Sequence, residues 1–549
     1  MTELGNATWI PSGERFLYSW VHQPSNGMVK GAVLIAPPLA REQVISYRTL
    51  RVLAIRLAEQ GWLAIRFGWT GTGESAEMPA AADITEVWQQ DLAAVADFAA
   101  GLVGTDNLHA IGLRAGAALL AASKIDFKSR LLWEPIGGKT FLRQHSMLRH
   151  VSLEEAPIPA SLGTELGGTI YLPEQALALS AVPNPRKLAA SELPAGSQLV
   201  IEADQDVAKS IYAVASVFAT VPPTSIQNLI DLLPETTASM ALPNWVALQT
   251  VQLSVPGFAG QIIEEILEIG PQKLPAVLSR PADDAETAAG SAILVAASAE
   301  PKDGVTSLWV LAARRLAAQG LATIRAERRG SGDLGNPEAL RDPNPYTHQA
   351  VEDIENVAHY LAARFEGPVT GIGLCAGAWL VGMASQKSPL DKVVMLNNVA
   401  WRDRVDYYER IYSENNVEEM LADERRSAAG QETKTLKSRI KSMLRRFGPY
   451  RLWLWLGKKT LTNAPEVLMD ASSRNAELLM YFGDADYGIF SMERGQQGLK
   501  RLRKADRKIS MRVDAPLDHA LLGHESRLKA IEIIEEVLLT EPAQLKALR

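Results

Sequence analysis

The chain has 549 residues, 47% of them hydrophobic, and a net charge of -7. It is too long for one hydrophobic core, so we expect two or more domains. The mildly acidic balance argues against nucleic-acid binding as the main activity, and a single cysteine excludes an intrachain disulfide framework. The first residues lack the features of a secretory signal, and no run has the roughly 20 apolar residues of a membrane span. We therefore expect a cytoplasmic protein.

The first predicted elements recur in the second half of the chain. The apolar run at 31–38 parallels that at 291–298, and the helix and strand at 52–66 parallel those at 311–325. Gly71-Thr72-Gly73-Glu74 corresponds to Gly330-Ser331-Gly332-Asp333, and 112–117 corresponds to 373–378. Since the offset is 259 to 261 residues, the repeat is too long for a solenoid unit and indicates two copies of a whole domain.

Each copy alternates short apolar runs with helices of three to four turns. This order predicts parallel βαβ units, hence a doubly wound α/β sheet covered on both faces. Gly330-x-Gly332-x-x-Gly335 is spelled like a nucleotide-binding loop, but the first copy lacks the third glycine. We interpret both glycine turns as loops that follow a strand.

The stretch 368–380 predicts a strand, a sharp turn and the start of a helix, with Gly373 and Gly377 flanking Cys375. This is the pattern of a nucleophile elbow, in which flanking side chains would collide with the backbone. The adjacent helix N-terminus would favour a thiolate. A lone Cys after an apolar run is also often a small buried hydrophobe. A dinucleotide reading of Gly371-x-Gly373-x-x-Ala376 lacks the acidic residue expected about 20 residues later.

The Gly-x-Gly turn followed by Gly-x-nucleophile-x-Gly resembles the α/β-hydrolase superfamily over nearly the whole chain. The resemblance implies two tandem hydrolase-like domains, at 1–272 and 273–549, the second with a helical cap at about 400–472. Short motifs at 36–42 and 132–139 resemble the second type of exosortase A system-associated hydrolase. Those at 373–376, 397–402 and 407–410 resemble the first type. This resemblance implies a role near bacterial exopolysaccharide or envelope glycolipid production.

The second copy offers partners for an elbow nucleophile, in the chain order nucleophile, acid, His. Asp486 lies three residues after Gly483, as the acid of such hydrolases commonly does, and is preferred to Asp484. His519 follows the last predicted strand, at 508–513, and precedes a helix predicted from Ser526 to Leu539; His524 is the alternative base. His519 would exchange the thiol proton, and Asp486 would orient the imidazole.

The backbone N–H groups of Ala376 and Ser298 are the candidate oxyanion donors of the same site. They follow the elbow residue and the first predicted strand of the second copy, at 291–295.

The first copy has Arg114 in the elbow position, and no histidine occurs between His150 and His348. A guanidinium is not a nucleophile at physiological pH. We therefore predict a pseudo-enzyme domain that serves as scaffold, interface or binding module. Arg114 either binds an anion or forms a structural salt bridge.

A long insertion between Leu396 and Leu478 predicts the cap. Its segment 434–459 carries nine Lys or Arg and no acid, with Leu436, Ile440, Met443, Leu444 and Phe447 on one helical face. It is either a cap helix with a solvated basic face or a contact with the inner, anionic face of the membrane. In both cases we expect an anionic, acyl-carrying or lipid-linked substrate.

Together these features predict cleavage of an ester or thioester, of a small molecule or a lipid-linked glycan, through an acyl-Cys375 intermediate. An acyltransferase with the same triad and a non-catalytic scaffold are the alternatives. The sequence suggests no metal, cofactor or nucleic-acid partner and leaves the oligomeric state open.

Overall fold

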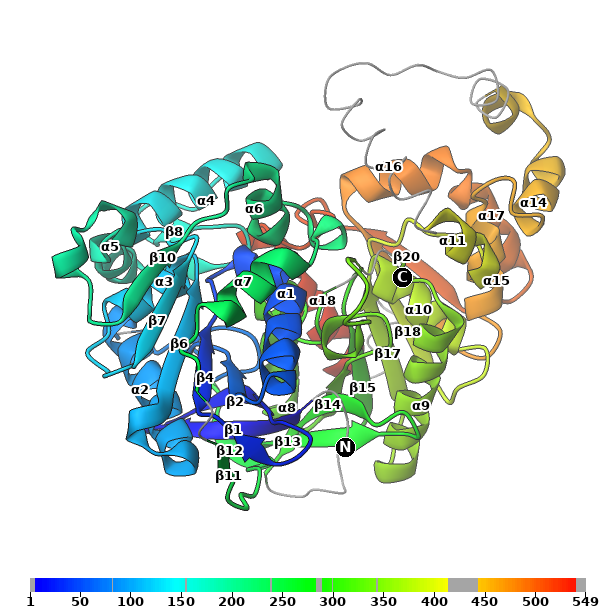
Figure 1. The fold of residues 1–549 in the computed structure, drawn as a ribbon. Helices are drawn as coiled ribbons and strands as arrows, with labels where there is room; N and C mark the ends of the chain where they lie inside the picture. The colour runs from blue at the N-terminus through cyan, green and yellow to red at the C-terminus, as the bar shows by residue number, and fades with distance from the viewer. Residues whose placement is uncertain are drawn as a thin grey trace.

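The computed structural model describes residues 5–80, 82–153, 156–236, 239–282, 289–298, 300–341, 344–412 and 443–539. Within these ranges the chain forms two large β-sheets, each with helices on both faces (Figure 1). Most neighbouring strands are parallel, because helices connect one strand to the next. The predicted fold class, α/β with doubly wound sheets, is confirmed.

The first sheet has seven strands in the order β1-β2-β5-β4-β6-β7-β10. The pairs β1–β2 and β2–β5 are antiparallel, and the other pairs are parallel. Its strands are β1 (Asn6–Ser12), β2 (Arg15–His22), β4 (Ala32–Ala36), β5 (Leu63–Phe67), β6 (Leu108–Leu113), β7 (Ser129–Trp133) and β10 (Ser197–Val200). Two short antiparallel pairs accompany it, β3 (Met28–Val29) with β11 (Met240–Ala241) and β8 (Thr164–Glu165) with β9 (Ile170–Tyr171).

The second sheet has nine strands in the order β12-β13-β14-β16-β15-β17-β18-β19-β20. From β13 to β19 it repeats the order of the first sheet strand by strand, and β12 and β20 are additional edges. Its strands are β12 (Thr250–Ser254), β13 (Gln261–Ile269), β14 (Leu274–Pro281), β15 (Ser291–Val295), β16 (Ala322–Ala326), β17 (Val369–Leu374), β18 (Lys392–Leu396), β19 (Glu477–Phe482) and β20 (Ile509–Val513). The internal repeat read from the sequence therefore corresponds to two sheets of matching topology.

The helices lie between these strands in the chain. Those of the N-terminal half are α1 (Arg41–Glu59), α2 (Ile84–Val103), α3 (Ala115–Ala121), α4 (Gly138–Ser152), α5 (Pro173–Ala181), α6 (Gln205–Tyr212) and α7 (Pro223–Asp231). Those described in the C-terminal half are α8 (Leu308–Ala317), α9 (His348–Arg364), α10 (Ala376–Ala384), α11 (Val405–Ile411), α14 (Tyr450–Lys458), α15 (Pro465–Ser472), α16 (Asp484–Met492), α17 (Gly495–Lys504) and α18 (His524–Leu539). The short 3₁₀ turns are η1 (Thr105–Asn107), η2 (Pro185–Lys187), η3 (Ala190–Glu192), η4 (Ser216–Phe218), η5 (Val305–Ser307) and η6 (Gly332–Leu334). None of the helices in the described ranges is long and apolar enough for a bilayer span.

The boundary between the sheets differs from the expected division at residue 272. That position falls in the turn between β13 and β14, which are paired along their whole length. The hydrogen bonds of β12 and β13 therefore assign 250–269 to the second sheet, and the first sheet ends before Thr250. The sequence boundary followed the repeated motifs, and these two strands precede the first motif of the second copy.

Alternating strand residues fill a core on each face of each sheet, as the two-residue period of a strand requires. In β15, Ile293 belongs to the core under α9 and α10, whereas Leu294 belongs to the core under α8 and α18. In β4, Leu34 packs with α2 and Val33 packs with α1. These cores fix the carboxyl ends of the parallel strands, where the elbow turns begin.

The antiparallel ends of the two sheets pack against each other. Trp9, Tyr18 and Trp20 of β1 and β2 form one apolar cluster with Val251, Ile266 and Val277 of β12, β13 and β14. These strands gather between the two halves in Figure 1. The two halves thus share a buried apolar contact.

Beside this cluster, two ion pairs cross between the halves in opposite directions. Arg66 donates to Asp333 at 2.7 Å, and Arg325 donates to Glu74 at 2.8 Å. The arginines occupy matching positions of β5 and β16, and the acids occupy matching positions of the two Gly-x-Gly turns. All four side chains are buried. The contact between the halves is therefore self-complementary, as in a two-fold symmetric interface.

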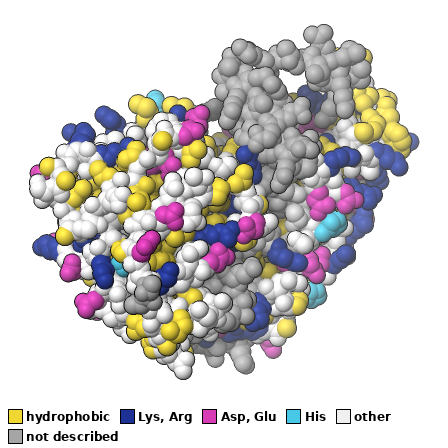
Figure 2. Space-filling view, viewed as in Figure 1, with side chains coloured by type: hydrophobic (Ala, Val, Ile, Leu, Met, Phe, Trp, Pro, Cys, Tyr) yellow, Lys and Arg dark blue, Asp and Glu magenta, His cyan; other side chains and the backbone are white. Residues whose placement is uncertain are grey.

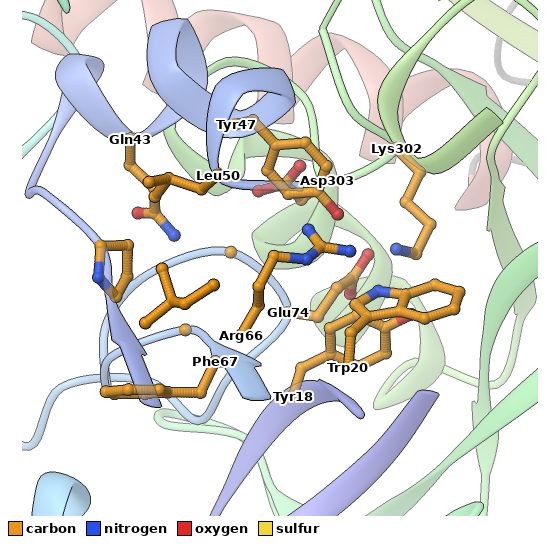
Figure 3. Close-up of a pocket in the computed structure, with 14 residues that line it drawn as sticks. Tyr18, Trp20, Gln43, Tyr47, Leu50, Arg66, Phe67, Glu74, Lys302 and Asp303 are labelled. Atoms are coloured by element: carbon orange, nitrogen blue, oxygen red, sulfur yellow. The ribbon is translucent and has the colours of Figure 1, made fainter. Parts of the chain in front are cut away.

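A small pocket lies within this interface (Figure 3). The polar ends of Tyr47, Arg66 and Glu74 from the N-terminal half and of Lys302 and Asp303 from the C-terminal half converge there. Lys302 is also paired with buried Glu327 at 3.6 Å. Removal of one partner from a buried ion pair leaves an unpaired buried charge, which destabilises the folded protein. This network therefore favours one arrangement of the two halves.

Candidate active site

Cys375 is the residue between β17 and α10, with φ 50° and ψ -110°. Positive φ is costly for a residue with a side chain, and strain of this kind is concentrated at functional sites. Its N–H donates to the carbonyl of Leu396 on neighbouring β18 at 3.0 Å, which fixes the turn. The thiol is partly exposed rather than buried in the core. The predicted elbow geometry is thus present at Cys375.

The two flanking glycines allow this turn to pack tightly. A Cβ on Gly373 would lie 2.2 Å from the backbone of Gly377, and a Cβ on Gly377 would lie 2.4 Å from the carbonyl of Val295. Both distances are far below a normal contact between carbon or oxygen atoms. The prediction that side chains at these positions would collide with the backbone is confirmed.

His519 and Asp486 meet at the carboxyl end of the same sheet. The Asp486 carboxylate is 2.8 Å from Nδ1 of His519, while the other carboxylate oxygen, Oδ2, is buried. Asp486 lies in the first turn of α16, and its neighbour Asp484 is exposed. The alternative base, His524, begins α18, where its backbone N–H donates to Glu165. Of the candidate acids and bases, Asp486 and His519 are therefore the hydrogen-bonded pair.

The surroundings of His519 favour its imidazolium form. Its pKa is raised to about 10, first by the hydrogen bond with Asp486 and then by the interaction with Cys375, against the effect of burial. Charge interactions with Cys375 and Asp486 also raise the pKa of His519. His519 is thus hydrogen-bonded to Asp486 and lines the same pocket as Cys375, with a proton favoured on its imidazole.

The two predicted oxyanion donors lie beside the thiol. Ala376 is the first residue of α10, so its N–H has no acceptor within the helix. Ser298 follows β15 with φ 37° and lines the same pocket as Cys375. Arg328 donates to the carbonyl of Ser298, which helps to fix the loop. Ala376 and Ser298 therefore stay candidate oxyanion donors.

Asn397 is a positioning residue whose role the sequence did not reveal. It follows β18 with φ 48°, and its side-chain oxygen accepts a hydrogen bond from the N–H of Gly483 at 2.9 Å. Its amide nitrogen donates to the carbonyl of Asp518 at 2.8 Å. One side chain therefore ties the start of the Asp486 helix to the His519 loop. Its place directly after a buried strand, at the edge that carries Cys375, was the available signal.

A pocket of about 250 Å³ opens at Cys375 and His519. Glu300 lies in its wall, and burial raises the pKa of this carboxyl to about 7, although the charges of Arg41, Arg328 and His519 oppose the shift. The pocket is otherwise largely apolar and is wide enough for a small acyl group.

The elbow of the N-terminal half has the same backbone without a nucleophile. Arg114 precedes α3 with φ 56°, and its guanidinium is bound by Glu42 at 3.0 Å and lies 3.9 Å from the ring of Tyr212. Both charged side chains are buried, and His145 also approaches Glu42, at 3.2 Å. Of the two predicted roles of Arg114, the structural salt bridge is the one observed.

Only part of the predicted basic cap segment lies in the described ranges, since 413–442 fall outside them, including Leu436 and Ile440. Of the remainder, Met443, Phe447 and Trp455 are exposed, whereas Trp453 is buried. Leu444 packs partly beneath α14. Apolar and basic side chains are neighbours on this surface around α14 (Figure 2).

No cluster of His, Cys, Asp and Glu able to hold a metal ion occurs among the described residues.

No family model matches the chain, and no curated protein matches its sequence. Solved structures with partial likeness include a dienelactone hydrolase from Anabaena variabilis, with 12% identity, a TM-score of 0.31, and coverage of 53% of this chain and 98% of that one. An esterase from Rhizomucor miehei has 12% identity and a TM-score of 0.31, over 53% of this chain and 83% of that one. An acylaminoacyl peptidase from Pyrococcus horikoshii has 11% identity and a TM-score of 0.32, over 51% of this chain and 40% of that one. Each likeness thus spans about half of this chain.

Proposed function

We propose that the protein is an α/β-hydrolase-type enzyme that cleaves an ester or thioester through an acyl-Cys375 intermediate. The observation that carries this proposal is that Cys375, at an elbow turn, shares a pocket with His519, which is hydrogen-bonded to Asp486. A structural cysteine would need neither a partly exposed side chain nor a neighbouring histidine oriented by a carboxylate.

In the acylation step, the Cys375 thiolate attacks the carbonyl carbon, and the carbonyl oxygen becomes an oxyanion facing the N–H groups of Ala376 and Ser298. The His519 imidazolium gives its proton to the leaving alcohol or thiol as the tetrahedral intermediate collapses. The raised pKa of His519 suits this acid role, since the proton is present at neutral pH.

Acylation also changes the state of the base. A thioester at Cys375 carries no charge, so the interaction with Cys375 that helps to raise the pKa of His519 is lost. A lower pKa lets His519 take a proton from water, which attacks the acyl carbon and releases free acid and thiol. The His519 side chain is 47% exposed, so solvent can reach it.

The experiment is intact-mass analysis after incubation with acyl-CoAs and simple esters. We expect an added acyl mass that is absent from Cys375→Ala, and free acid released at the rate at which the adduct decays. Faster decay only when sugar hydroxyls are supplied would reassign the enzyme as an acyltransferase. No adduct and no turnover with any donor, together with a Cys375 that resists thiol reagents, would leave a non-catalytic scaffold.

We also propose that the enzyme works beside an anionic membrane, where a lipid-linked glycan intermediate of exopolysaccharide or envelope glycolipid production would be its substrate. The substrate class comes from the family resemblance of the short motifs. The membrane contact is supported by exposed Phe447 and Trp455 among basic residues, with no acid from 443 to 465. Flotation with vesicles of anionic lipid tests it: Trp455→Ser with Phe447→Ser should reduce binding, whereas equal binding to neutral vesicles would contradict it.

A further inference from the structure

The pocket at Cys375 has walls from both halves of the chain. The C-terminal half contributes the elbow, the Ser298 loop and the His519 loop, including Leu374, Val305 and Leu522. The N-terminal half contributes Val44 and Ile45 of α1 and Val217 of η4. A half that lacks a nucleophile of its own therefore borders the nucleophile of the other.

The α1 part of this wall is held firmly against the C-terminal half. The Tyr47 hydroxyl donates to Asp333 at 2.6 Å, and Arg48 donates to the carbonyl of Asn336 at 2.7 Å. Arg51 donates to the carbonyl of Gly332 at 3.2 Å. Val44, Arg48 and Arg51 are spaced to lie on one face of a helix. The face of α1 that carries Val44 is thus also the face that is hydrogen-bonded to the C-terminal half.

The η4 part is attached as well. The N–H of Val221, shortly after η4, donates to the carbonyl of Leu340 in the C-terminal half at 2.9 Å. The Thr49 hydroxyl of α1 donates to the carbonyl of Thr220 at 3.4 Å, which joins η4 to α1. Val44 and Val217 therefore line the pocket of the thiol from two connected segments of the N-terminal half.

The side chains on this surface are branched and aliphatic. Ile45 is buried, and Val44 and Val217 are partly exposed toward the pocket. The polar lining residues Arg41 and Glu300 are close enough for their charges to interact. An aliphatic surface facing a nucleophile binds the apolar part of a substrate, because burial removes that part from water.

We propose that the N-terminal half forms the acyl-binding wall of the Cys375 site, and that the site takes esters or thioesters of aliphatic acyl groups. This inference rests on the proposed function and goes beyond it by assigning acyl-chain selection to Val44 and Val217. The first half is then a specificity module of the second.

The test compares acetyl and octanoyl esters of 4-nitrophenol with the full-length protein. Val44→Trp and Val217→Trp each fill the pocket, so we expect the octanoyl-to-acetyl ratio of kcat/KM to fall by about tenfold or more. Val217→Ala enlarges the pocket and should shift the same ratio the other way. Val246→Trp, at a 94% exposed position of the same half, is the matched control and should leave the ratio unchanged.

If the ratio is unchanged in all three pocket variants and the protein still forms the acyl adduct, the N-terminal half does not select the acyl group. That result would leave the proposed function intact. Absence of any Cys375 adduct from wild-type protein with either ester would overturn both. Because Val217→Ala creates no clash, it tests the wall even if a tryptophan variant fails to fold.

Discussion

Arg114 and Cys375 occupy the same turn in two sheets of matching strand order, with φ of 56° and 50°. Gly116 and Gly377 have the same role in their respective turns, since a Cβ would lie 2.3 Å from a carbonyl oxygen at Gly116 and 2.4 Å from one at Gly377. The side chains differ: Arg114 is bound by buried Glu42, whereas Cys375 is partly exposed beside His519. The backbone conformation of the elbow is thus a property of the fold. A catalytic function also requires a nucleophilic side chain and suitable neighbouring residues.

The residues after the next strand extend the comparison. Glu134 and Asn397 both have φ 48°, and each accepts a hydrogen bond from the backbone after the following strand, at Glu202 and Gly483. Glu134 uses its other oxygen to bind Arg186, whereas the Asn397 amide donates to the His519 loop. A carboxylate only accepts hydrogen bonds, but an amide both donates and accepts. Only the C-terminal residue can therefore hold both the acid and the base elements.

The largest expected effect separates the two elbows directly. Cys375→Ala should lower turnover by about 10⁴-fold or more, because the acyl-enzyme can no longer form. The double variant Arg114→Gln with Glu42→Gln, which replaces the buried ion pair by neutral groups, should keep turnover within a few-fold. Ester hydrolysis and the acyl-adduct mass measure both. Equal losses in the two proteins would contradict a division of labour between the halves.

Asp486→Asn tests the orienting acid and should lower the rate at pH 7 by about 10⁴-fold. Its hydrogen bond is the main reason that the pKa of His519 is raised to about 10. The imidazolium form dominates below that pKa and is lost above it. In the variant the loss should begin at lower pH, so the alkaline limb of the acylation rate moves toward neutrality. Single-turnover rates across pH measure this, and an unmoved limb would exclude the assigned role.

Glu74→Gln breaks one of the reciprocal ion pairs and leaves Arg325 with less compensation. Loss of a buried partner costs about 3–5 kcal/mol of unfolding free energy. Glu338→Gln is the matched control, because its pair with Arg56 also joins the halves but is exposed, and it should cost less than about 1 kcal/mol. Urea denaturation measures both. Similar midpoints for the two variants would show that the buried pairs do not hold the halves together.

The smallest of these effects concerns Asn397, whose side chain joins the start of the Asp486 helix to the His519 loop. Asn397→Asp loses the donation to Asp518, so the base loop shifts and kcat should fall by about 10²-fold with little change in KM. Glu134→Gln makes the corresponding change in the other half and should leave kcat unaffected. Steady-state kinetics and thermal melting of both variants separate positioning from stability. A rise in KM at constant kcat would instead assign Asn397 to substrate binding.

The repeat, the elbow and the pairing of Asp486 with His519 could be predicted because each depends on local pattern and chain order. Gly373 and Gly377 identify the turn, and the places after the last two strands identify the acid and base. The placement of Asp486 in a helix was not predicted, since Gly483 alone does not determine whether the chain continues as loop or helix.

Contacts between the copies could not be predicted in the same way. The partners of Arg66 and Glu74 are 267 and 251 residues away in sequence, and only the packed structure brings them together. Whether β12 and β13 join the first or the second sheet likewise depends on which sheet has an open edge strand. A useful signal was available nonetheless: Arg66 and Arg325 are aligned charged residues within two otherwise apolar strands.

The reciprocal pairing of Arg66 with Asp333 and of Arg325 with Glu74 has a consequence for how this protein can vary. In a dimer of identical subunits, every substitution appears at both active sites, so one site cannot lose its nucleophile without the other. Here the two sides of an equivalent interface are encoded separately in one polypeptide. Arg114 could therefore replace a nucleophile on one side while Cys375 was kept on the other, at a fixed ratio of one to one.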